Sequence, residues 1–191
     1  MTKVYLQPGI RGLSGKMGDW VYSIRNGKTY VGMAPMITKD PSEAQIAHRE
    51  RFSDAADYAK FAIAEGNPLR EIYMLASKER AIPAFALAVS DYLKLPEVKT
   101  LDLTYYNGQV GNNIPIVTSD DFGVTGVHVV IRDLEGNIIE SGSASEFPQN
   151  SGHWSYASTA SVPSGTTIVV YASATDRPGG VGTQNAEKTI S

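Results

Sequence analysis

Residues 94–108, with the sequence KLPEVKTLDLTYYNG, mark the point at which the apolar pattern of this chain changes its period. Before Pro96 the apolar residues recur at helical spacing, and after it they alternate as they do in β-strands. Proline cannot continue the helical pattern, and Asn107-Gly108 is a pair typical of a turn. The sequence therefore predicts an α+β fold that divides near Pro96 into a helical part and a β part.

The part that follows Pro96 has the pattern of a β-sandwich. Short segments rich in strand-forming residues alternate with turn signals such as Asp120-Asp121 and Pro163-Ser164-Gly165. This spacing is typical of an immunoglobulin-like sandwich, and we expect Trp154 and Tyr156 to lie on its core face. The predicted strands cover residues 98–106, 113–119, 126–133, 137–143, 153–161, 166–174 and 184–190.

The preceding part of the chain carries helix signals. Asp40 is a suitable N-cap, Pro41 suits the first helical position, and Glu43 would complete a capping box. Two further helices start at Asn67-Pro68 and at Pro83, and several apolar positions are alanine, which lets helices approach closely. The predicted helices cover residues 40–65, 68–80 and 83–95.

A β-hairpin is predicted in residues 20–31, which have the sequence WVYSIRNGKTYV. Asn26-Gly27 between β-rich runs is a strong hairpin signal, because both turn positions need φ above zero. A two-residue loop places Arg25 opposite Lys28 and, at the far end, Trp20 opposite Met33. One face of the hairpin is then apolar, and since an isolated hairpin is marginally stable, we expect this face to dock on the helices or on another subunit. The face carries Trp20, Tyr22, Ile24, Val31 and Met33.

Charge is unevenly distributed along the 191 residues, whose net charge is −3 from 17 basic and 20 acidic residues. Residues 1–39 hold six basic side chains and one acidic one, a net charge of +5, whereas residues 101–191 hold three basic and nine acidic ones, a net charge of −6. Three interpretations stay open: a basic surface for nucleic acid, head-to-tail attraction between copies, and two solvated surfaces that differ by chance. The candidate interaction residues are Lys16, Trp20, Tyr22, Ile24, Arg25, Lys28 and Tyr30.

Residue patterns for catalysis, metal binding or cofactor binding are not found. The chain has no cysteine, which excludes disulfides, thiolate nucleophiles and cysteine-based zinc sites, and it has three histidines. The run Gly12-Leu13-Ser14-Gly15-Lys16 is close to a phosphate-binding loop, but Ile10 stands where the motif needs glycine and Met17 where it needs serine or threonine. The sequence has no G-x-S-x-G elbow and no H-E-x-x-H helix. We therefore expect a protein without enzymatic activity, cofactor or metal site.

The expected location follows from two further patterns. The start of the chain lacks the apolar core of a secretory signal, and no window approaches the apolar length of a membrane span. The expectation is a protein of the cytoplasm, or of a particle assembled in the cytoplasm.

The predicted sandwich loops leave open a calcium- or carbohydrate-binding module. Asp120, Asp121 and Asp176 lie in loops, and carboxylate oxygens are the ligands that calcium prefers. Trp154 would offer a stacking platform for a sugar if its side chain were exposed. Turn-forming carboxylates and a buried tryptophan are the competing explanations for the same residues.

The N-terminal half combines the motifs Gly12-x-x-Gly15-Lys16-x-Gly18, Asn26-Gly27-Lys28 with Pro35, and Ser42-Glu43-Ala44-Gln45 with Arg49, Arg51 and Phe52. This combination resembles an uncharacterised family of proteins of similar length encoded in Bacteroidetes genomes. The second half, in residues 120–124, 135–137 and 174–176, resembles bacterial immunoglobulin-like domains. The family resemblance carries over no catalytic residue, and by analogy alone immunoglobulin-like domains imply adhesion, assembly or decoration of larger particles.

The sequence thus predicts two domains, a glycine-rich hairpin and helical domain in residues 1–95 and an immunoglobulin-like sandwich in residues 96–191. The favoured function is a structural or assembly protein that self-associates or decorates a larger particle or filament. Its expected partner is protein, as a homo-oligomer or a larger assembly. The alternatives are a nucleic-acid-associated protein that uses the basic N-terminal part, and the calcium- or carbohydrate-binding module.

Overall fold

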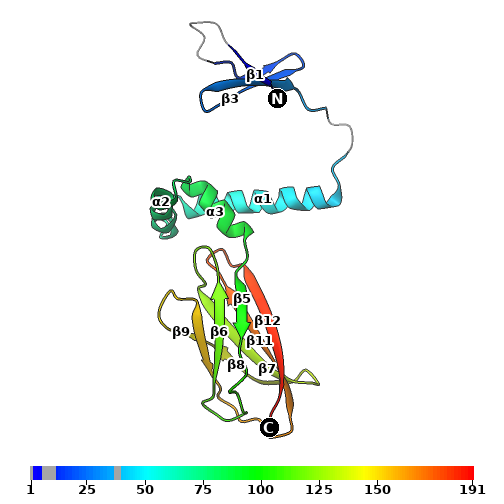
Figure 1. Ribbon diagram of the computed structural model, residues 1–191, viewed down its shortest axis with the longest axis vertical. Helices are drawn as coiled ribbons and strands as arrows, with labels where there is room; N and C mark the ends of the chain where they lie inside the picture. Colours follow the sequence, from blue (N-terminus) through cyan, green and yellow to red (C-terminus); the bar gives the residue numbers. More distant parts are fainter. Residues whose placement is uncertain (1, 6–11, 37–39) are drawn as a thin grey trace. The chain divides into compact units, whose positions relative to one another are not determined.

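The computed structural model describes residues 2–5, 12–36 and 40–191, and it confirms the predicted α+β fold with an immunoglobulin-like sandwich (Figure 1). The chain forms two compact units, Met1–Ile46 and Ala47–Ser191. The first unit contains a small antiparallel sheet, and the second contains most of the helical part and the whole sandwich.

The sheet of the first unit is built around the predicted hairpin. Strands β3 and β4 pair with Trp20 opposite Met33 and Arg25 opposite Lys28, so the predicted register is confirmed. Asn26 and Gly27 have φ angles of 48° and 71°, as the two-residue turn requires. Two short flanking strands, which the sequence did not predict, extend the hairpin to the order β1-β4-β3-β2. The strands are β1 (Thr2–Val4), β2 (Gly15–Met17), β3 (Trp20–Arg25) and β4 (Lys28–Met33).

The helices lie where the apolar pattern placed them. They are α1 (Glu43–Ala62), α2 (Leu69–Arg80) and α3 (Ala84–Leu93). The capping box of α1 is formed by Ser42 and Gln45 rather than by the expected Asp40 and Glu43. The Ser42 N–H donates to Gln45 Oε1 at 3.0 Å, and the Gln45 N–H donates to Ser42 Oγ at 3.3 Å. Helix formation begins after Ser42, which is therefore the residue whose side chain can reach the unpaired amides.

A compact cluster rich in alanine holds the three helices together. Six of its nine buried members among the described residues are alanines, and beside the cluster Tyr58 stacks at a tilt on Tyr92 with ring centroids 5.4 Å apart. The buried members of the cluster are Ala55, Ala59, Ala62, Tyr73, Ala76, Ala84, Leu87, Ala88 and Val89.

The sandwich consists of two four-stranded antiparallel sheets, in the orders β5-β6-β10-β9 and β12-β11-β7-β8. Alternate residues of both sheets face inward, and Ile114, Val129 and Val170 are completely buried between them. The strands are β5 (Glu97–Leu101), β6 (Asn113–Ser119), β7 (Gly126–Asp133), β8 (Ile138–Ser143), β9 (Ser145–Glu146), β10 (His153–Ala157), β11 (Thr167–Thr175) and β12 (Val181–Thr189).

The predicted strands correspond to these elements with two shortened ends and with a last strand that begins at Val181 rather than at residue 184. The first ends at Leu101 rather than at residue 106, because Asp102 accepts hydrogen bonds from the N–H and hydroxyl of Thr104 and turns the chain. The fifth ends at Ala157, where the Ser158 hydroxyl donates to the carbonyl of Gln109 at 2.7 Å. The two-residue β9 was not predicted.

The predicted change of structure at Pro96 separates two hydrophobic clusters, one among the helices and one inside the sandwich. The compact units, however, divide between Ile46 and Ala47, so that the helical cluster and the sandwich belong to the same unit. The predicted domains, 1–95 and 96–191, stay a prediction.

Candidate functional site

The N-terminal sheet sorts the predicted interaction residues onto two opposite faces. Directly paired residues of antiparallel strands point to the same side, and successive residues of one strand alternate. The pairing of β3 with β4 and β2 therefore decides the face of each residue. Trp20, Tyr22 and Ile24 lie on one face, and Lys16, Arg25, Lys28 and Tyr30 lie on the other.

The first of these, the apolar face, consists of Met17, Trp20, Tyr22, Ile24, Val31 and Met33. Met17, Trp20 and Met33 stand next to one another in a row across β2, β3 and β4. Their exposed fractions are 64%, 49% and 70%. A contiguous row of large exposed apolar side chains is typical of a surface that contacts another molecule.

The segment before β2 covers a small part of the apolar face. The Leu13 N–H donates to Thr29 Oγ1 at 3.3 Å, and a Cβ on Gly12 would lie 2.5 Å from Ile24 Cδ1. A larger residue than Gly12 would therefore displace the end of the Ile24 side chain. Among the described residues of the first unit, Thr29 alone is buried, so these residues contain no hydrophobic core of their own.

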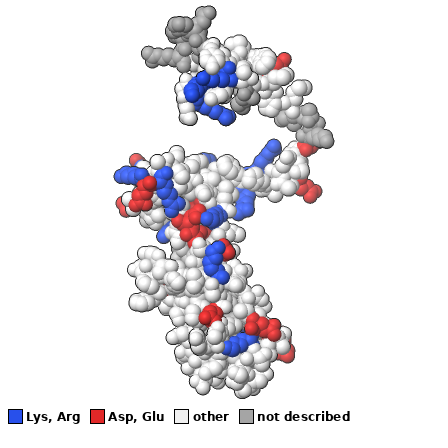
Figure 2. All heavy atoms as spheres, viewed as in Figure 1, with Lys and Arg blue, Asp and Glu red and all other residues white. Residues whose placement is uncertain are grey.

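The opposite side, the basic face, consists of Lys3, Lys16, Arg25 and Lys28 with Tyr30 between them. Arg25 and Lys28 are direct cross-strand partners, and Lys3 pairs with Tyr30. Within the described ranges, none of these four cations forms an ion pair. The cations remain solvated, and Figure 2 shows Lys and Arg side chains gathered on this unit.

Tyr5 adds a second aromatic ring on the side of the basic face. The Lys3 ammonium lies 4.8 Å from the centroid of the Tyr5 ring, and this ring is 86% exposed. Asp19 belongs to the turn between β2 and β3, where its carbonyl accepts a hydrogen bond from the Ala34 N–H at 2.7 Å. The basic face therefore combines positive charge with two tyrosines.

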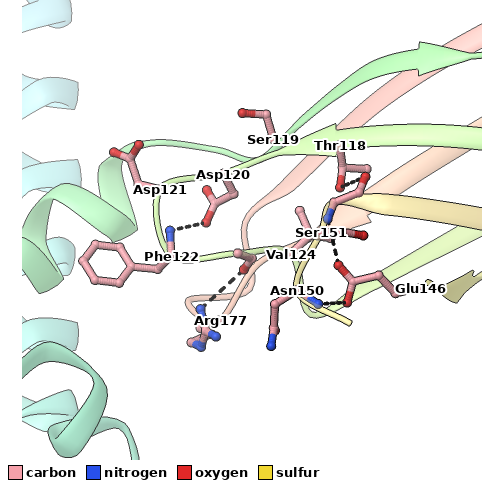
Figure 3. Close-up of a pocket in the computed structure, with 12 residues that line it drawn as sticks. Thr118, Ser119, Asp120, Asp121, Phe122, Val124, Glu146, Asn150, Ser151 and Arg177 are labelled. Carbon is pink, nitrogen blue, oxygen red and sulfur yellow. Dashed lines mark hydrogen bonds between the residues drawn. The ribbon is translucent and has the colours of Figure 1, made fainter. Parts of the chain in front are cut away.

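The second unit has a polar pocket of about 600 Å³ at one end of the sandwich (Figure 3). Its carboxylates are engaged in holding its loops. Glu146 accepts hydrogen bonds from the N–H groups of Asn150 and Gly152 at 3.0 and 2.9 Å, and Asp120 accepts one from the N–H of Phe122 at 2.9 Å. The Arg177 guanidinium donates a longer bond, of 3.4 Å, to the Gly123 carbonyl.

Each of the three carboxylates considered for calcium has another partner in the structure, since Asp120 accepts the hydrogen bond from the Phe122 N–H. Asp121 forms a 2.6 Å ion pair with Lys94, and Asp176 is buried and accepts a hydrogen bond from the Gly180 N–H at 2.6 Å. Across residues 2–5, 12–36 and 40–191, no group of three or more histidine or carboxylate side chains is placed to hold a metal ion.

Trp154 lies inside the sandwich, so the prediction of a core position is confirmed and the alternative of an exposed sugar platform is wrong. Its side chain is 8% exposed, and its indole N–H donates to Thr118 Oγ1 at 3.0 Å. The alternation of β10 directs both Trp154 and Tyr156 inward.

A buried polar network among the helices was not predicted. Tyr58 and Tyr73 share a hydrogen bond of 2.8 Å, and the Tyr73 hydroxyl donates to Asp91 Oδ2 at 2.5 Å. Burial raises the pKa of Asp91 to about 6, the Tyr73 hydrogen bond opposes this rise, and the nearby carboxylates of Asp120 and Asp176 add to it. The signal in the sequence is that Asp91 continues the inward stripe of Leu87 and Ala88 at helical spacing. Because Asp91 lines none of the described pockets, we assign it to the packing of the helices.

No protein-family model and no curated protein matches the chain. Among solved structures, CopC from Methylosinus trichosporium OB3b is similar at 11% identity, over 48% of this chain and 89% of that one, with a TM-score of 0.36. A tetra-tandem repeat in the extending region of a large adhesion protein is 26% identical over 51% of this chain, with a TM-score of 0.35. Domains 1–6 of the surface layer protein SbsC are 15% identical over 77% of this chain, with a TM-score of 0.33. The alignments span 24% of the adhesion chain and 24% of the surface-layer chain, and similarities this weak carry no functional argument.

None of the helices in the described part of the chain is long and apolar enough to cross a membrane.

Proposed function

We infer that this protein is a non-enzymatic structural subunit that associates with copies of itself through the apolar face of its N-terminal sheet. The observation that carries this proposal is the row of Met17, Trp20 and Met33, which lies exposed on a sheet whose described residues contain no core. Small sheets need a packed face for stability, because the backbone entropy lost on folding must be offset by apolar burial. A second copy supplies such a packed face.

The apolar face fits its own counterpart on a second copy. Two sheets that pack face to face bury their inner side chains in one layer and form a small sandwich. A two-fold axis makes the contact self-complementary, so that each tryptophan meets the apolar row of the partner. The partner copy then provides the core that each N-terminal sheet lacks.

The charges of the sheet are compatible with this arrangement. Lys16, Arg25 and Lys28 lie on the face opposite to Trp20, so face-to-face packing keeps the cations of both copies on the outside. Packing through the basic faces would instead bring like charges together without compensation. Charge therefore favours one of the two possible ways of stacking these sheets.

The experiment compares the full chain with its Trp20→Ser variant by size-exclusion chromatography with light scattering over a range of concentrations. We expect a dimer or larger species for the parent chain and dissociation at least about 30-fold more favourable in the variant, because a central interface tryptophan contributes about 2 kcal/mol or more. Tyr105→Ser is the matched control, because it removes an aromatic side chain that is 83% exposed in the second unit.

Two results would overturn the proposal. One is a parent chain that stays monomeric at the highest concentration. The other is a Trp20→Ser variant whose mass distribution matches that of the parent. Amide hydrogen exchange in β3 and β4 adds an independent reading, since protection of these amides should rise with protein concentration if a second copy stabilises the sheet.

A further inference from the structure

We propose that the basic face of the N-terminal sheet binds single-stranded nucleic acid. This interaction uses the side of the sheet opposite to the apolar face and does not depend on the self-association proposed above. The strand register brings side chains from all four strands to this one surface.

The cations of the basic face are spread across the sheet. Lys3 lies on β1, Lys28 on β4, Arg25 on β3 and Lys16 on β2. With neighbouring strands about 4.8 Å apart, the outer two stand about 14 Å apart across the sheet. Along the strands, Arg25 and Lys28 stand side by side at the turn, Lys3 lies level with Tyr30, and Lys16 lies level with Val21. Solvated cations spread in this way suit a chain of phosphates better than a single compact anion, because several phosphates can be neutralised at once.

Two tyrosines lie among these cations. Tyr30 is the direct partner of Lys3, and the Lys3 ammonium lies over the exposed Tyr5 ring. Aromatic rings beside cations on an open surface are typical of single-strand binding, where unstacked bases lie on the rings and phosphates follow the cations. A duplex hides the flat faces of its bases and would use the cations alone, which is why we assign a single strand.

The remainder of the chain restricts binding to this face. With +5 in residues 1–39 and −3 in the whole chain, the rest of the molecule is acidic and repels a polyanion. The same imbalance makes an acidic surface of a second copy the competing occupant of the basic face. The tyrosines favour nucleic acid over that occupant, and the experiment separates the two.

The test measures fluorescence anisotropy of a labelled oligothymidylate of roughly 20 nucleotides with the full chain between about 50 and 200 mM salt. Four phosphate contacts predict a slope of about −2.8 in a plot of log affinity against log salt, which is a loss of about 50-fold over this range. Lys16→Ala with Lys28→Ala should halve the slope, so that the loss falls to about 7-fold.

Lys60→Ala with Lys78→Ala is the matched control, since it removes the same charge from exposed positions of α1 and α2. This control should keep the parent slope. Tyr5→Ser, at a position too exposed to unfold the sheet, should weaken binding about tenfold or more while leaving the salt slope unchanged, because it removes stacking and no charge.

Three results would overturn the proposal: no binding at the lowest salt, an unchanged salt slope in the Lys16 and Lys28 variant, or an equal reduction of the salt slope in the Lys60 and Lys78 control. The basic face would instead be assigned to a protein contact by a pair of results. The parent chain would not bind oligothymidylate, and the variant with Lys16→Ala and Lys28→Ala would lose self-association in light scattering. Tighter binding of a duplex of the same length, unaffected by Tyr5→Ser, would contradict the single-strand assignment.

Discussion

At the residue scale, the buried carboxyl of Asp91 links packing to pH. It is 1% exposed, and one of its oxygens has no hydrogen-bond partner among the described residues. Its ordinary pKa is 3.8 and its folded pKa is about 6, chiefly because burial disfavours the charged form. The native state therefore binds this proton more tightly than the unfolded chain does. The cost of charging Asp91 is absent below about pH 4, grows between pH 4 and 6, and is complete above pH 6.

Asp91→Asn tests this cost. The amide keeps an acceptor for the Tyr73 hydroxyl but carries no charge. We expect the free energy of unfolding at pH 7 to rise by about 1–3 kcal/mol, and its decline between pH 4 and 6 to flatten. Burial also raises the pKa of Asp176, so the variant should keep some decline of stability with rising pH.

Urea denaturation at pH 5 and at pH 7 measures this change. Asp54→Asn is the control, because Asp54 is exposed on α1 and its replacement should alter stability by less than about 0.5 kcal/mol. An Asp91→Asn variant that is less stable than the parent at pH 7 would contradict the prediction, because it would show that the buried charge of Asp91 does not lower the free energy of unfolding.

Glu140 is a buried acceptor that fixes the chain after β10. Its Oε2 accepts hydrogen bonds from the Thr159 N–H at 2.6 Å, the Thr159 hydroxyl at 2.7 Å, the Ala160 N–H at 3.1 Å and the Tyr156 hydroxyl at 3.2 Å. Glu140→Ala leaves these donors without their acceptor, and we expect the free energy of unfolding to fall by about 3 kcal/mol. Thermal or urea unfolding checks this, with the exposed Glu135→Ala as control. A loss as small as that of the control would contradict it.

At the element scale, the first half of α1 depends on its cap. No residue from Glu43 to Asp54 is buried, so this half gains little from apolar packing within the described chain. Its tie to α3 is Arg51, whose guanidinium donates to the Leu93 carbonyl at 2.6 Å. The reciprocal hydrogen bonds of Ser42 and Gln45 are then its main local stabilisation.

Ser42→Ala should lower the stability of this half of α1 by about 1 kcal/mol, because the Gln45 N–H loses its acceptor, the Ser42 hydroxyl. Hydrogen exchange of the amides in residues 43–54 measures the effect, which should appear as faster exchange there and unchanged exchange in α2 and α3. Ser53→Ala, an exposed position inside the helix, is the control and should not speed exchange. Equal exchange in both variants would mean that the cap contributes nothing.

The hairpin shows why some elements follow from the sequence and their neighbours do not. Asn26-Gly27 selects one turn type, and the turn then sets every pair from Arg25 with Lys28 to Trp20 with Met33. The flanking strands β1 and β2 have three residues each, too few for a periodic pattern. They form because the hairpin offers unpaired edges, which is a property of the assembled sheet.

At the scale of the whole molecule, both hydrophobic clusters belong to the second unit. A chain that begins at Asp40 keeps both clusters and loses only the N-terminal sheet. We expect this chain to fold and to stay monomeric, with a melting temperature within a few degrees of that of the full chain. Calorimetry and light scattering check this expectation. An unfolded truncated chain, or one that associates like the parent, would contradict it.

Local and periodic information in the sequence determined the helices, most of the sandwich strands and the hairpin register. Turn residues, proline and the period of the apolar residues act over a few residues of chain, so the elements they produce can be predicted from the sequence alone. Trp154 shows how far such local information reaches. The alternation along its strand predicts that it faces the core, but its exposure of only 8% depends on the opposing sheet.

Only the tertiary structure decided how the interaction residues are grouped. Seven residues, from Lys16 to Tyr30, formed one candidate set in the sequence, and strand pairing divided them into an apolar face and a basic face. Asp91 likewise owes its raised pKa chiefly to burial against other elements, with the carboxylates of Asp120 and Asp176 adding to it. The physical reason is the same in both cases: side-chain surroundings depend on contacts between segments far apart in the chain, and a single sequence does not specify those contacts locally.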